Sequence, residues 1–198
     1  MQNRGLLKEL IQSFCCLPGV GPKSAQRMAF HLLQRNRQGG EQLSRILAQA
    51  LQEIAYCAEC RTLTETKLCE VCANSQRDTG LLCVVESPAD SWIIDQAIGF
   101  KGKYFILHGR LSPLDGIGPD QLGIDALEQR LQAGAISEII LATNSTVEGQ
   151  ATAHFIAEIA GKHNIRATRI AYGIPMGGEL EFIDSSTLSH AFNGRREI

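Results

Sequence analysis

Four cysteines in the first half of the chain have the spacing of a metal site. The stretch CAECRTLTETKLCEVC holds two Cys-x2-Cys pairs with eight residues between them, at Cys57, Cys60, Cys69 and Cys72. Each pair forms a turn that presents two thiolates to one ion, and two such turns close a tetrahedral zinc site. Four thiolates leave no open position for a substrate, so we expect a single structural Zn²⁺ per chain. The alternative is two redox-active thiol turns, which rarely occur in tandem.

A glycine-rich turn near the N-terminus precedes a basic helix face. The stretch LPGVGPKSAQRMAFHLL predicts a helix-hairpin-helix, in which Gly19 and Gly21 permit a tight turn with outward-facing backbone N–H groups. The second helix then carries basic side chains at four-residue steps, Lys23, Arg27 and His31. Gly19, Gly21, Lys23 and Arg27 are therefore predicted to bind DNA phosphates without reading sequence. An ordinary helical hairpin is the alternative.

A nucleotide-binding P-loop is a poorer interpretation of the same stretch. Pro22 stands before Lys23 where a P-loop has glycine, and a helical pattern precedes the turn where a P-loop needs a strand.

The charge of the chain is unevenly distributed. The net charge is −2, yet residues 1–40 hold six basic side chains and one acidic one. The remaining residues hold 13 basic and 20 acidic side chains. A polyanion is therefore expected to approach the N-terminal region.

An incomplete acidic motif follows one of the predicted strands. Families that cut or rejoin nucleic acids with a metal ion often carry Asp-x-Asp-x-Glu-Gly at a strand-to-helix turn. Here Glu148 and Gly149 are kept, whereas Asn144 and Thr146 stand at the aspartate positions. Neutral oxygens bind a divalent cation weakly, so catalysis is not expected.

The same edge of the sheet is predicted to carry Glu86, because the carboxyl ends of parallel strands lie together. We interpret these side chains as a partner-binding or vestigial acidic site, Glu86, Asn144, Thr146 and Glu148. The alternative is a metal-dependent nuclease or phosphotransferase that uses Glu86 and Glu148.

Apolar periodicity predicts a mixed α/β chain. Helical patterns cover 6–14, 23–35 and 43–56, with a polar loop at 34–40. From residue 80, short apolar strands alternate with helices, which indicates a parallel sheet covered on both faces. The strands are expected at 81–87, 104–109, 138–143 and 166–173, and the helices at 91–98, 120–133 and 149–163. A turn, an extended piece and a short helix are expected to end the chain.

Four regions are predicted from these changes of pattern. They are a hairpin region at 1–56, a zinc finger at 57–79, an α/β domain at 80–175 and a C-terminal segment at 176–198. The last segment is rich in apolar residues and is predicted to mediate oligomerisation. No apolar run is long enough to span a membrane and no secretion signal opens the chain, so a cytoplasmic protein is expected.

These motifs, in this order, resemble the bacterial recombination-mediator RecR family over essentially the whole chain. The stretches VVESPAD, LHGRLSPLDGIGP and TRIAYGIPMGGELEFID add to the resemblance. It implies a Toprim fold for the α/β domain and a non-enzymatic DNA-binding protein of recombinational repair. It also implies RecO and RecF as partners, assistance in loading RecA onto single-stranded DNA, and a ring-like homotetramer. Ser145 and Gln150 depart from the family pattern, which has proline and glutamate there.

Overall fold

The computed structural model of the chain describes residues 5–171 and 173–195. The chain divides into two compact units, Met1–Ile54 and Ala55–Ile198. Each unit has its own set of packed elements.

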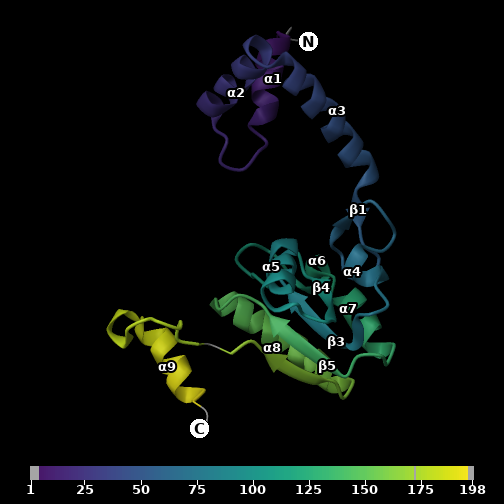
Figure 1. The fold of residues 1–198 in the computed structure, drawn as a ribbon, viewed down its shortest axis with the longest axis vertical. Coiled ribbons are helices and arrows are strands. Elements are labelled where there is room, and N and C mark those ends of the chain that lie inside the picture. The colour runs from purple at the N-terminus through teal and green to yellow at the C-terminus, as the bar shows by residue number, and fades with distance from the viewer. Residues whose placement is uncertain (1–4, 172, 196–198) are drawn as a thin grey trace. The chain divides into compact units, whose positions relative to one another are not determined.

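The first unit is built from three helices, α1 (Leu6–Phe14), α2 (Pro22–Gln34) and α3 (Arg37–Glu53). Figure 1 shows α1 and α2 joined by the glycine turn. Ala25 and Ala29 are fully buried, so small side chains let α2 approach its neighbours closely. Gly19 has φ of +75°, a backbone conformation that glycine adopts without steric cost. The predicted helix-hairpin-helix is confirmed.

The predicted polar loop at 34–40 is wrong in its extent, because α3 already begins at Arg37. The Asn36 side chain caps this helix by accepting a 2.9 Å hydrogen bond from the Gly39 backbone N–H. A Cβ atom on residue 39 would collide with that same asparagine side chain. The glycine therefore belongs to the first turn of a capped helix, not to a loop.

The second unit contains a four-stranded sheet in the order β4-β3-β5-β6. All neighbouring strands are parallel, as the alternation of strands and helices predicts. The strands are β3 (Asp78–Val85), β4 (Gly102–Ile106), β5 (Glu138–Ala142) and β6 (Arg166–Arg169).

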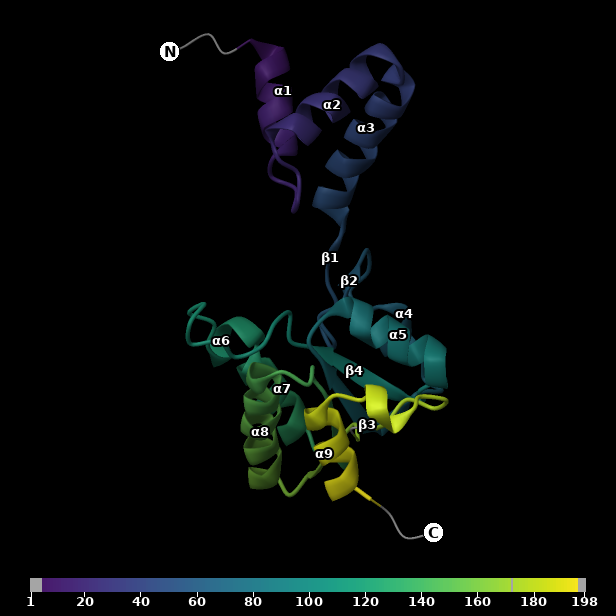
Figure 2. The ribbon, with the colours of Figure 1, turned by 90° about the vertical axis from the view of Figure 1, so that its left-hand side faces the viewer.

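Helices cover both faces of this sheet, as expected (Figure 2). They are α5 (Pro88–Ile98) on one face and α7 (Ile124–Gln132) and α8 (Val147–Lys162) on the other. Successive residues of β3 alternate between the faces: Leu82 and Val84 join the core under α7 and α8, whereas Cys83 and Val85 join the core under α5.

The helix predicted at 120–133 is interrupted. Gly123 has φ of +69° and separates α6 (Pro119–Leu122) from α7. A left-handed residue cannot continue an α-helix, so the chain changes direction there.

Two short segments flank the α/β part of the second unit. The cysteine segment forms β1 (Ala55–Tyr56), β2 (Leu63–Thr64) and α4 (Glu70–Ala73). After the sheet, the extended piece expected in the C-terminal stretch is in part a 3-10 turn, η1 (Leu180–Phe182). The last helix is α9 (Ser185–Asn193), whose N-cap is Asp184.

Candidate functional site

The four predicted metal ligands lie together and are buried. The four Sγ atoms all lie within 4.8 Å of one another, and they belong to Cys57, Cys60, Cys69 and Cys72. Four sulfur atoms held about 2.3 Å from one Zn²⁺ have similar separations, so the residues fit the ion. Among the described residues, no other group of three or more histidine, cysteine or acidic side chains is placed to hold a metal. The prediction of a structural zinc is confirmed.

Backbone N–H groups prepare the thiolates for the ion. The Cys69 N–H donates to the Cys57 Sγ at 3.3 Å, and the Cys72 N–H donates to the Cys69 Sγ at 3.5 Å. Hydrogen bonding with Cys72 lowers the pKa of the Cys60 thiol to about 5. The same hydrogen bond raises the pKa of the Cys72 thiol. Zinc binds the thiolate form of cysteine, so any thiol protons are released when it binds.

The cysteine segment (β1, β2 and α4), called the zinc segment from here on, lies against one of the two edges of the sheet, that of β4. Strand β4 is an edge strand, and its Ile106 N–H donates to the Cys60 carbonyl at 2.9 Å. Arg130 links the zinc segment to β4, because its Nη1 donates to the carbonyls of Glu59 and Tyr104 at 3.1 and 2.8 Å. An uncovered strand edge invites pairing with other chains. The zinc segment therefore protects the sheet as well as binding the ion.

The glycine turn and the basic side chains of α2 lie on the surface of the first unit. Lys23, Arg27 and His31 are all exposed, whereas Ala25 and Ala29 face the interior. The helix begins at Pro22 with no side-chain cap on its first N–H groups. A free helix N-terminus that is followed by cations is a ready site for phosphate.

The structure brings Glu86 and Asn144 into direct contact at the carboxyl ends of β3 and β5. The Asn144 backbone N–H donates to Glu86 Oε1 at 2.8 Å, and the side-chain amide donates to Oε2 at 2.7 Å. Glu86 is only 6% exposed, and the Arg110 guanidinium lies 3.8 Å from its Oε2. Both oxygens of this carboxylate therefore already have partners in the protein. An aspartate at position 144 would bring a second carboxylate against Glu86, and the two negative charges would need a cation between them. The neutral amide of Asn144 needs none.

The other two residues of the acidic motif have separate surroundings. Thr146 is the N-cap of α8, and its Oγ1 accepts a 3.1 Å hydrogen bond from the Gly149 N–H. Glu148 lies in the first turn of α8 and is partly buried. A Cβ atom on residue 149 would collide with the Asn144 carbonyl and lie 2.9 Å from Glu86 Oε1. Glycine is thus needed for the contact between Glu86 and Asn144, with or without a metal.

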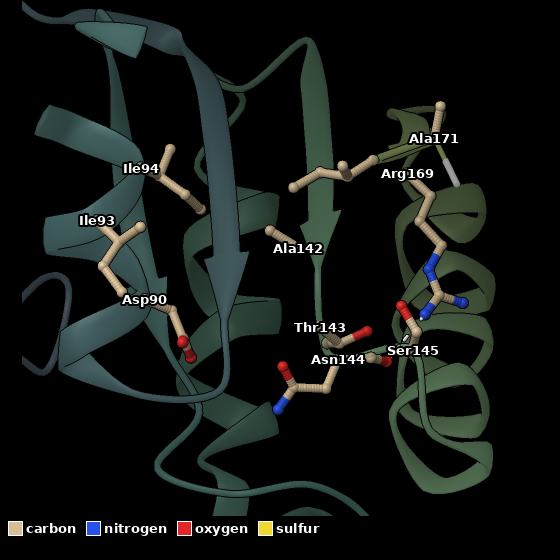
Figure 3. Close-up of a pocket in the computed structure, with 10 residues that line it drawn as sticks. Asp90, Ile93, Ile94, Ala142, Thr143, Asn144, Ser145, Arg169 and Ala171 are labelled. Atoms are coloured by element: carbon tan, nitrogen blue, oxygen red, sulfur yellow. Dashed lines mark hydrogen bonds between the residues drawn. The ribbon is translucent and has the colours of Figure 1, made fainter. Parts of the chain in front are cut away.

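A small cleft of about 270 Å³ opens beside Asn144. Figure 3 shows Asp90 and Ile93 from α5 on one side and Arg169 on the other. The Asp90 carboxylate forms a capping box with Ser87, accepting from its backbone N–H at 2.9 Å. Arg169 Nη2 donates to the Asn144 carbonyl at 3.1 Å. Asp90 serves the fold of its helix, so the cleft offers no open set of carboxylates.

Sequence reasoning missed several residues that organise these sites. Arg110, Arg130 and Arg169 act over long sequence separations, which no local pattern indicates. Lys103 did leave a signal, because a lysine inside the apolar strand KYFIL is unusual.

Among the described residues, the helices include none that is long and apolar enough to cross a membrane.

Family models match successive parts of the chain. A "RecR, helix-hairpin-helix" model matches residues 7–51, and a model of the RecR four-cysteine zinc finger domain matches residues 54–74. A "Toprim domain" model covers residues 80–171, and a "RecR, C-terminal" model covers residues 173–196.

Curated relatives match the chain along its whole length. The chain is 58% identical over 198 residues to "Recombination protein RecR" of Methylococcus capsulatus, with 100% of both chains covered. It is 58% identical over 193 residues to the protein of that name from Xylella fastidiosa, and 57% identical to that from Xanthomonas campestris pv. campestris. In both of these comparisons, 98% of each chain is covered. With this identity over its full length, the chain belongs to the RecR family of recombination proteins.

Proposed function

We propose that this protein binds DNA during recombinational repair and performs no chemistry on it. A role in recombination and an ability to bind DNA follow from the family and its helix-hairpin-helix. We infer in addition that the protein is not a catalyst, and one observation supports this inference most strongly. The buried Glu86 carboxylate accepts hydrogen bonds from Asn144 on both oxygens, so a metal ion would have to displace a paired amide. A weakly held Mg²⁺ does not offset the loss of two charge-assisted hydrogen bonds.

The DNA-binding surface that we propose is the hairpin of the first unit. Gly19 and Gly21 shape the turn, and Lys23 and Arg27 extend from the helix that follows it. These groups are suited to contact phosphates, and phosphate contacts carry no sequence information. Binding is therefore independent of sequence and weakens as salt rises.

A closed ring is the assembly that we propose, because the chain offers two separate apolar surfaces. Helix α3 exposes large apolar side chains at helical spacing, Leu43, Ile46, Leu47 and Leu51. The C-terminal segment exposes another group, Met176, Leu180, Phe182 and Phe192. Two different self-complementary interfaces per chain close a homotetramer with two-fold symmetries. A ring of this kind would present several hairpins to one DNA.

RecO and RecF are the partners that we propose, with RecA loading onto single-stranded DNA as the outcome. This part rests on membership of the family and on the resemblance of the motifs. We assign partner docking to the edge of the sheet at Glu86, Asn144, Thr146 and Glu148. The cleft beside Asn144 has apolar walls and a basic side, which suits an inserted side chain of a protein. We also propose that the protein works in the cytoplasm, where the bacterial chromosome lies.

A metal-dependent nuclease or phosphotransferase is the competing proposal. It would use Glu86 with Glu148, whose carboxylate lies in the first turn of α8. This enzyme needs Mg²⁺ at the edge of the sheet, and its activity would disappear when either carboxylate becomes an amide.

The cleavage of supercoiled plasmid DNA distinguishes the two proposals. We expect no nicking, relaxation or linearisation with Mg²⁺ or Mn²⁺, because the Glu86 carboxylate is already paired and Asn144 and Thr146 carry no charge. The wild type and Glu148→Gln should give identical gels while binding DNA equally. An activity that copurifies with the wild type and is lost in Glu148→Gln would establish the enzyme instead.

A further inference from the structure

Lys103 is a buried cation in edge strand β4. The residue is 5% exposed, although lysine is almost never buried unless it is paired. Among the described residues, no carboxylate lies within ion-pair distance of its Nζ. The sheet itself therefore gives no reason for a positive charge at this position.

The partners of this ammonium group all lie in the zinc segment. The Nζ donates to the carbonyls of Val71, Cys72 and Asn74 at 3.1, 2.6 and 3.2 Å. These carbonyls belong to the last turn and the C-cap of α4, where backbone acceptors have no partner within the helix. Three donors thus meet three acceptors, and the shortest bond is to the backbone of a zinc ligand.

The charge of the metal centre explains why a cation is buried at position 103. Four thiolates bound to one Zn²⁺ leave the centre with a net charge of about −2. All four cysteines are buried, so solvent screens this charge poorly. Lys103 is a cation that the structure places against the second Cys-x2-Cys turn. A buried charge of one sign is stabilised when the opposite charge is held nearby.

We propose that Lys103 is a positioning residue of the zinc centre, which fixes the second Cys-x2-Cys turn and offsets the negative charge of the tetrathiolate. Loss of this charge makes the thiolates more nucleophilic and the zinc easier to remove. Partners just outside the ligands of a metal change its affinity by about 10- to 100-fold.

The test compares two substitutions that both disturb the packing of the lysine. Lys103→Gln keeps two N–H donors for the carbonyls but removes the charge, whereas Lys103→Arg keeps the charge. Lys101→Met is the matched control, because Lys101 is an exposed lysine two residues away. Zinc affinity is measured by competition with a chromophoric chelator. Thiolate reactivity is measured as the rate at which a maleimide releases zinc from the folded protein.

We expect Lys103→Gln to bind zinc about 10- to 100-fold more weakly and to react faster with maleimide. Lys103→Arg should restore most of the loss, and Lys101→Met should match the wild type. A Lys103→Gln chain that fails to fold where Lys103→Arg folds also supports the role of the charge. Equal behaviour of the glutamine and arginine variants, folded or unfolded, would overturn the proposal.

Discussion

Replacing Cys72 with serine is expected to abolish zinc binding and to destabilise the second unit by several kcal/mol. Structural zinc supplies about 10–16 kcal/mol of folding free energy in isolated zinc-finger peptides. Here α4 is a single short helix, and the neighbouring core contains the cysteine side chains themselves. We expect loss of the ion to loosen the segment that carries the Cys60 carbonyl, which accepts the hydrogen bond of the Ile106 N–H at the edge of β4. The variant should therefore also aggregate through that exposed strand.

Metal analysis, thermal unfolding and light scattering measure these effects. Cys83→Ala is the matched control, because Cys83 is equally buried but lies outside the metal cluster. That variant should keep its zinc and lose only about 1 kcal/mol of stability. A Cys72→Ser protein that retains a full complement of zinc, or melts like the control, would refute the structural role of the site.

Deleting residues 175–198 is expected to weaken DNA binding by far more than the loss of direct contacts explains. The exposed apolar side chains of this segment include Met176, Phe182 and Phe192, and none of them suits a phosphate. If they join subunits, their loss removes the effective concentration that links several hairpins on one DNA. Linked binding of this kind multiplies affinity by about 10²- to 10⁴-fold. Smaller particles and a loss within this range are the expected result.

Light scattering after size-exclusion chromatography gives the particle mass, and fluorescence anisotropy gives the DNA affinity. Zinc content and circular dichroism establish that the truncated chain remains folded. A gentler variant, Phe182→Ala with Phe192→Ala, should shift both measurements in the same direction. Ser189→Ala, an exposed polar change within α9, should alter neither. A folded monomer that binds DNA as tightly as the full chain would rule out the ring.

The elements that local chemistry determines are predictable from this sequence. The paired cysteines predict the metal cluster because each Cys-x2-Cys turn is complete within four residues. Alternating apolar strands and helices predict the parallel sheet. The start of α3 is missed because the cap by Asn36 changes two glycines from a loop signal into part of a helix.

The details of the acidic edge depend on contacts between distant residues. Glu86 and Asn144 are 58 residues apart, and no local pattern predicts that one asparagine donates a hydrogen bond to each oxygen of one carboxylate. The replacement of aspartate by Asn144 indicates that metal chemistry is weakened, but the structure supplies the physical reason. Lys103 is similar, because only the fold places its ammonium against carbonyls 29 to 32 residues earlier in the chain.

The proposal that the hairpin holds DNA by its phosphates is tested most directly by the salt dependence of binding. Anisotropy titrations at several salt concentrations are compared for the wild type, Lys23→Ala, Arg27→Ala and the control Lys162→Ala, whose lysine lies at the end of α8. We predict that each hairpin variant binds unrelated DNA sequences equally weakly. The slope of log affinity against log salt should become shallower by about one unit per phosphate contact removed. Slopes for Lys23→Ala and Arg27→Ala that equal those of the wild type and Lys162→Ala would contradict phosphate binding by the hairpin.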